Sequence, residues 1–220
     1  MQARLWRSTS LRERVAVAAL LLAVGASASC GKANSEGRSP SYLFIDGLTA
    51  SSGARPDDFG NALESDVITN VKTTVDGKET YVPTIFEDFG RVTLKMALKD
   101  PGGANAPTQP TSTNAITVTR YHVDFKRSDG RNTPGVDVPY GFDGGATGTF
   151  NSNGGALSFV LVRAQAKIET PLKALRNGGG AIIISTIAEI TFYGTDQNGN
   201  AVSVTGTISV NFADWGDPLI

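Results

Sequence analysis

The chain has 220 residues and a formal net charge of −1, with 40% hydrophobic and 19% charged side chains. These values are ordinary for a globular protein and exclude an intrinsically disordered chain. A single cysteine excludes a disulfide framework, so an exported domain would depend on burial of apolar surface for its stability.

The first 29 residues have the layout of a secretory signal peptide. Four arginines form a basic head, residues 15–26 are an apolar run, and small residues continue from there to Cys30. About a dozen apolar residues are too few to span a bilayer, which requires roughly 20. We therefore predict that residues 1–29 are removed on export. An amphipathic or buried N-terminal helix is the alternative.

Cys30 falls at the predicted cleavage point and is preceded by Ser27, Ala28 and Ser29. This arrangement resembles the lipobox of bacterial lipoproteins, although Ser27 stands where Leu is usual. The resemblance implies a diacylglyceryl group on Cys30, and Gly31 behind it implies sorting to the outer membrane. The alternative is ordinary cleavage after Ala28, which would release a secreted protein with a free thiol.

Residues 30–41 are small and polar, and they predict a flexible tether whose ends lie roughly 18 Å apart on average. Removal of residues 1–29 takes away four Arg and one Glu, which leaves 16 basic and 20 acidic side chains. This balance argues against a nucleic-acid partner, because nucleic acid requires a basic surface. We expect membrane attachment through the lipid alone, since there is no second hydrophobic span.

Residues 42–220 predict an all-β domain. Its front half should hold a strand at 42–48 with a bulge or bend at Asp46-Gly47, and an inserted hairpin at about 66–86 that turns at Asp76-Gly77. Pro83 makes the second strand of this hairpin an edge strand. A clearly alternating strand at 91–99 and a long Pro/Gly/Thr loop at 100–114 follow.

The back half predicts five more strands and one helical turn. In the strand at 115–127 the apolar face changes parity, which requires a bulge near Thr119 or Arg120. The remaining strands are expected at 136–142, 156–169, 181–194 and 200–213, with a helical turn at 170–178. Asn198-Gly199 predicts a type I′ turn between the last two strands.

The segment from Tyr193 to Asn200 reads Tyr-Gly-Thr-Asp-Gln-Asn-Gly-Asn and precedes an alternating strand. It resembles the last hairpin of bacterial Ig-like and fibronectin-III-like modules. The resemblance implies a Greek-key β-sandwich, and the predicted strands supply its seven core strands. The antibody-type Cys-Trp-Cys core is excluded, because the first strand has no Cys and both Trp residues lie outside any middle strand.

Few residues suggest chemistry. His122 is the single histidine and has no second His or free Cys for a triad or a zinc site, so it should face solvent or a polar seam. The carboxylates that could form a hydrolytic pair are better interpreted as solvated loop charges: Asp57, Asp58, Glu87, Asp88, Asp124 and Asp143. We expect no catalytic residues.

No metal or cofactor is expected either. Asp196, Asn198 and Asn200 have the spacing of the first three ligands of a calcium loop, but Ala201 and Thr207 replace the Gly and Glu that the loop requires. A hairpin turn explains these residues better.

The sequence therefore predicts a non-enzymatic, lipid-anchored envelope protein that binds or spaces another surface component, either an envelope protein or a glycan. The hairpin at 66–86 and the loop at 100–114 are the expected contact surfaces. The alternative is a secreted or surface carbohydrate-binding module, in which Trp215 is the candidate ligand contact among Tyr81, Tyr140, Phe142, Phe150 and Trp215. A calcium-stabilised adhesin is a third hypothesis.

Overall fold

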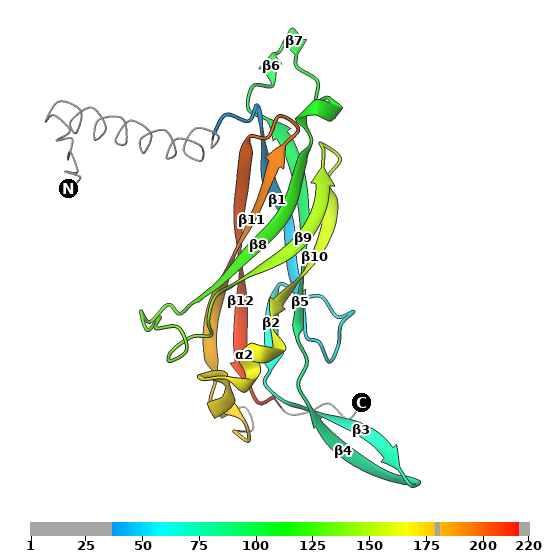
Figure 1. Cartoon of the computed structure of the whole chain (residues 1–220), viewed down its shortest axis with the longest axis vertical. Coiled ribbons are helices and arrows are strands. Elements are labelled where there is room, and N and C mark those ends of the chain that lie inside the picture. The colour runs from blue at the N-terminus through cyan, green and yellow to red at the C-terminus, as the bar shows by residue number, and fades with distance from the viewer. Residues whose placement is uncertain (1–36, 179–180, 216–220) are drawn as a thin grey trace, which may run out of the picture.

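The chain folds into two β-sheets with almost no helix, as seen in a computed structural model that describes residues 37–178 and 181–215 (Figure 1). The predicted signal peptide and Cys30 lie outside the described residues. The three-stranded sheet has the order β1 (Ser41–Ser51), β5 (Asp88–Leu98), β10 (Gly155–Val162). The five-stranded sheet has the order β2 (Ala62–Asp66), β12 (Ala201–Ala213), β11 (Ile184–Asp196), β8 (Ile116–Lys126), β9 (Phe142–Phe150).

Neighbouring strands are antiparallel, except that β2 pairs parallel to β12. Two short hairpins lie outside these sheets: β3 (Thr69–Val75) with β4 (Lys78–Thr84), and β6 (Gly102–Gly103) with β7 (Ala106–Pro107). The crossover from β10 to β11 carries α2 (Ala164–Ile168) and the 3₁₀ turn η2 (Leu172–Leu175), and η1 (Ser112–Asn114) precedes β8. No described helix is long and apolar enough to cross a membrane.

The core forms where the inner faces of the two sheets meet. Phe159 of β10 packs edge-on against Phe192 of β11 with ring centroids 5.2 Å apart, and Tyr121 of β8 lies 5.2 Å from Phe159. The Tyr121 hydroxyl also accepts a hydrogen bond from the Val160 backbone N–H at 3.2 Å, and burial raises the pKa of Tyr121. Gly90 of β5 makes room for this cluster, because a Cβ there would lie 2.3 Å from the Phe159 ring.

Both predicted bulges are confirmed. The β1–β5 register shifts between Ile45 and Gly47, and the β8–β9 register shifts between Val118 and Arg120. The expected strands at 42–48, 91–99, 115–127, 181–194 and 200–213 and the helical turn within 170–178 are also present.

The predicted strand at 136–142 is wrong. Residues 127–141 form a loop, and the strand begins at Phe142 and runs through Gly144, Gly145 and Gly148 to Phe150. Glycine disfavours a strand locally, but Gly144 lies opposite Tyr121, where a Cβ would be 2.3 Å from the tyrosine ring. Tertiary packing therefore overrides the local preference.

Two further predictions need correction. The expected strand at 156–169 ends at Val162, and α2 follows it. The turn at Asn198-Gly199 is not type I′, because only Gly199 has a positive φ, of 81°. Asp196 and Asn200 instead close a three-residue loop whose last residue is in the left-handed region.

The inserted hairpin β3–β4 is confirmed and projects from one end of the body (Figure 1). Asp76 and Gly77 both have positive φ, 49° and 76°, as a type I′ turn requires. We call residues 69–84 the arm. Both strands of the arm are edges, which accommodates Pro83.

A buried ion pair lies beneath the base of the arm. The Lys167 ammonium of α2 lies 2.9 and 2.8 Å from the two carboxylate oxygens of Asp88, and the exposed side-chain fractions are 1% and 0%. Ser65 of β2 donates to the same carboxylate at 2.6 Å, and the Gly53 N–H donates at 3.0 Å. The pair therefore joins β5, β2, α2 and the loop after β1, which come from both sheets and their connections.

We expect Lys167→Met to lower the free energy of unfolding by about 3–5 kcal/mol, because it leaves a buried carboxylate without its counter-charge. Urea denaturation measures this. Lys95→Met is the matched control: Lys95 pairs with Asp46 at 2.8 Å but is partly exposed, and its loss should cost less than about 1 kcal/mol. Equal losses for the two variants would contradict the assignment.

Candidate functional site

His122 lies on the outer face of the five-stranded sheet between two carboxylates. Its Nδ1 is 3.2 Å from Asp143 and its Nε2 is 3.3 Å from Asp124. The expectation that it faces a polar seam is confirmed. Within the part of the chain that the structure describes, no three His, Cys, Asp or Glu residues are grouped so that they could hold a metal ion.

The carboxylates do not share one environment. Asp57, Asp58 and Glu87 are exposed, as expected of solvated loop charges. For Asp88 that interpretation is wrong, because it is fully buried against Lys167. Lys167 lies 79 residues further along the chain, so no local pattern pointed to the pair.

Asp196 organises the last hairpin. Its Oδ1 accepts hydrogen bonds from the backbone N–H groups of Asn198 and Asn200, both at 2.9 Å, and its Oδ2 accepts one from the Asn200 side chain at 2.9 Å. Burial opposes ionisation, but hydrogen bonds from Asn200, Ser39 and Asn198 outweigh it and lower the pKa of Asp196. The residues that resemble a calcium loop thus serve the turn.

A groove with a volume of about 490 Å³ lies at the end of the body where β1 begins. Its walls come from the start of β1 with the segment before it, Lys99, the bulge of β8, and the facing ends of β11 and β12. Its polar and aromatic side chains include Tyr42, Lys99, Thr119, Arg120, Tyr193, Thr195 and Ser203. We call this the bulge groove.

The bulge in β8 builds the groove. It turns the successive residues Thr119 and Arg120 to the exposed side, and Arg120 lies over the ring of Tyr193 at 3.8 Å. Gly194 allows the strands to approach here, because a Cβ would lie 2.3 Å from the Thr117 carbonyl oxygen. Bulges often re-aim side chains at binding sites.

The segment before β1 forms part of the same wall. Ser39 and Ser41 are buried, and the Ser41 hydroxyl donates to the Asn114 carbonyl at 2.8 Å. The Lys99 N–H donates to the Pro40 carbonyl at 2.9 Å. The folded domain therefore includes the last residues of the predicted tether.

The candidate aromatic contacts are divided by exposure. Phe142 and Phe150 are core residues, whereas Tyr81 on the arm and Tyr140 are exposed by 47% and 53%. Trp215 is partly buried and lines a small pocket of about 200 Å³ with Arg55, Glu64 and Asp66 among others. Its backbone N–H donates to Asp66 at 3.1 Å, which fixes it beside the base of the arm.

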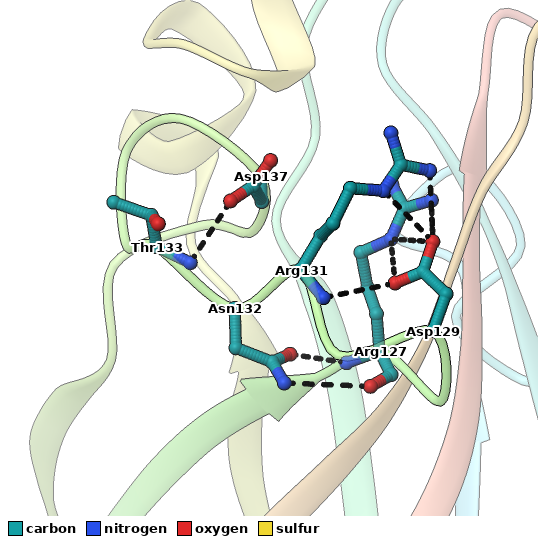
Figure 2. Close-up of polar contacts among 6 residues, drawn as sticks. All are labelled: Arg127, Asp129, Arg131, Asn132, Thr133 and Asp137. Atoms are coloured by element: carbon teal, nitrogen blue, oxygen red, sulfur yellow. Dashed lines mark hydrogen bonds and ion pairs between the residues drawn. The ribbon is translucent and has the colours of Figure 1, made fainter.

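The loop at 127–141 is held by its own side chains (Figure 2). Arg127 and Arg131 both donate to Asp129, and these hydrogen bonds hold the pKa of Asp129 well below its usual range. The Asn132 side-chain oxygen accepts a hydrogen bond from the Arg127 N–H at 2.6 Å, and its amide nitrogen donates one to the Arg127 carbonyl at 3.4 Å.

No family model, curated protein or solved structure matches this chain. Function is therefore inferred from the geometry of its own residues.

We expect Asp196→Ala to lower the free energy of unfolding by about 1–3 kcal/mol, because it leaves backbone donors of the turn unpaired. The folded-state pKa is lowered, so the stabilisation should be present above roughly pH 4 and be lost as the pH falls through the folded pKa. Urea denaturation at several pH values measures both effects, with the exposed Asp58→Ala as control. A dependence of the melting temperature on EDTA would instead support calcium at this turn.

Proposed function

We propose that the chain is a non-enzymatic, lipid-anchored envelope protein whose Ig-like sandwich carries the arm away from the membrane, where it binds or spaces another surface component. The observation that carries this proposal is the position of the two ends. β1, the first described strand after the predicted anchor in the sequence, begins at one end of the body, and the arm projects from the opposite end (Figure 1).

The strand order supports the Ig-like part of the proposal. If β1, β5, β8, β9, β10, β11 and β12 are named A, B, C, C′, E, F and G, the sheets read A-B-E and G-F-C-C′. This division of strands is that of immunoglobulin-like sandwiches. β2 then adds a parallel edge strand beside G.

Strand lengths give the reach of such a display. β12 has 13 residues and each arm strand has 7. At about 3.3 Å per residue, the body is roughly 43 Å long and the arm adds roughly 23 Å.

The β6–β7 hairpin of the 100–114 loop lies at the opposite end from the arm (Figure 1). The geometry therefore favours the arm as the distal contact surface.

The non-enzymatic part is supported by the use of the reactive groups. Asp88 and Lys167 neutralise each other inside the fold, and both His122 nitrogens face carboxylates. A second candidate function, carbohydrate binding, is favoured by the bulge groove and its tyrosines.

The anchor is tested by the intact mass of the protein recovered from the membrane fraction of an expressing bacterium. We expect a chain that begins at Cys30 and carries acyl mass. Cys30→Ser should block both the acylation and the membrane association. A bare chain that begins at Ser29 in the soluble fraction would contradict the anchor and support secretion.

The arm is tested by photo-crosslinking in intact cells with a photoreactive phenylalanine at Tyr81. We expect a defined crosslinked species, because the Tyr81 ring is exposed on the distal arm. The same probe at Tyr140, a tyrosine of similar exposure on the 127–141 loop, should not give that species. Crosslinks from Tyr140 alone would move the contact surface to that loop.

A further inference from the structure

We propose that the bulge groove binds an acidic sugar, a saccharide residue that carries a carboxylate, within a glycan chain. This assignment rests on the proposed function, because it identifies an acidic polysaccharide as a surface component that the protein contacts. The ligand would lie at the anchored end of the domain, away from the arm.

The charge of the groove is opposite to that of the domain. The chain without residues 1–29 carries 16 basic and 20 acidic groups, yet no lining residue of the groove is acidic and two are cationic, Lys99 and Arg120. The Lys99 ammonium donates to the Gly37 carbonyl at 2.9 Å and forms no ion pair with a described carboxylate. Its positive charge is therefore available to an anion.

Arg120 is positioned rather than free. It lies 3.3 Å from Asp143 and stacks on Tyr193, so its guanidinium is held at the rim of the groove. A guanidinium has five donors in a planar fork, and one carboxylate contact leaves donors for a second acceptor.

Unpaired hydroxyl groups line the walls. The side-chain hydroxyls of Tyr42, Thr119, Thr195 and Ser203 form no hydrogen bond with another described residue, and they come from four different strands. Hydroxyls both donate and accept, which matches the hydroxyls of a sugar. A set of hydroxyls spread over several walls suits a ligand with many polar groups better than a compact anion.

An aromatic ring completes the set. Tyr42 is 44% exposed, and Phe44 lies beside it with ring centroids 6.4 Å apart. One face of the Tyr193 ring is covered by Arg120, so Tyr42 offers the open apolar surface on which the C–H face of a sugar ring can pack. The volume of about 490 Å³ falls in the range of ligand sites, roughly 300–1,000 Å³.

The groove is also preformed. Paired strands, the bulge and the buried Ser39 and Ser41 fix its walls, so a ligand would not have to order them. Preformed walls reduce the entropic cost of binding.

The test is calorimetric titration of the purified full chain with three probes: a galacturonic acid trisaccharide, a neutral galactose trisaccharide and inorganic phosphate. We expect the acidic trisaccharide to bind at least tenfold more tightly than either other probe. Lys99→Met and Tyr42→Ala should each weaken it by about tenfold or more, which corresponds to the loss of about 1.4 kcal/mol. Lys78→Met and Tyr140→Ala, exposed residues outside the groove, should leave binding unchanged.

Several outcomes would overturn the proposal. Equal binding of the neutral trisaccharide would remove the role of the charge, and tighter binding of phosphate would assign the groove to a phosphate group. Binding of phosphatidylglycerol vesicles to the purified chain, lost in the Lys99→Met variant, would assign the groove to a lipid surface. If the folded chain binds none of the probes, the proposal for the groove is wrong. The proposed anchor and arm would not be affected by that result, because they are tested separately in cells at Cys30 and Tyr81.

Discussion

The ion pair between Lys167 and Asp88 is the constraint on which the arm end of the domain depends. Burying two charges is costly, and the cost is recovered only when the remaining donors and acceptors are satisfied. Here Ser65 and the Gly53 N–H complete the carboxylate shell. The arm leaves the body just after Ser65 and returns just before Asp88, so the same contacts that neutralise the charge also hold both ends of the arm. An isolated two-stranded hairpin is only marginally stable in water. The direction of the arm is therefore set by the structure at its base, which the Lys167–Asp88 pair holds together.

The end of the domain at which β1 begins is shaped by different features. There the groove arises from strand irregularity, since the bulge at Thr119 turns two successive side chains outward and Gly194 lets the backbone of β8 come close. The aromatic cluster of Tyr121, Phe159 and Phe192 lies between the two sheets and separates these features from the ion pair. A display role for the arm and a binding role for the groove are thus compatible in one small domain.

The sequence predicts the strands whose side chains alternate clearly, and it even predicts the bulge in β8, because a change of parity can only be absorbed by an extra residue. It fails where tertiary contacts decide. β9 reads as a Gly-rich loop until Tyr121 is seen to need Gly144 opposite its ring, and β2 was not expected as a sheet strand because its pairing with β12 is parallel and distant in sequence. Asp88 reads as a solvated charge because its partner lies 79 residues away. The groove draws on segments spread from Gly37 to Ser203, so no motif could have revealed it.

The carboxylates that are held most tightly are already committed to the fold. Asp88 neutralises Lys167, Asp129 joins two arginines, and Asp196 closes the last hairpin. Hydrogen bonds lower the pKa of Asp129 and, against the opposing effect of burial, that of Asp196, so both stay ionised at neutral pH and neither is suited to donate a proton there. Lys99 differs, since its ammonium meets only a backbone carbonyl and faces a groove without acidic side chains. This arrangement of charges supports the proposed recognition of an external anion by the bulge groove.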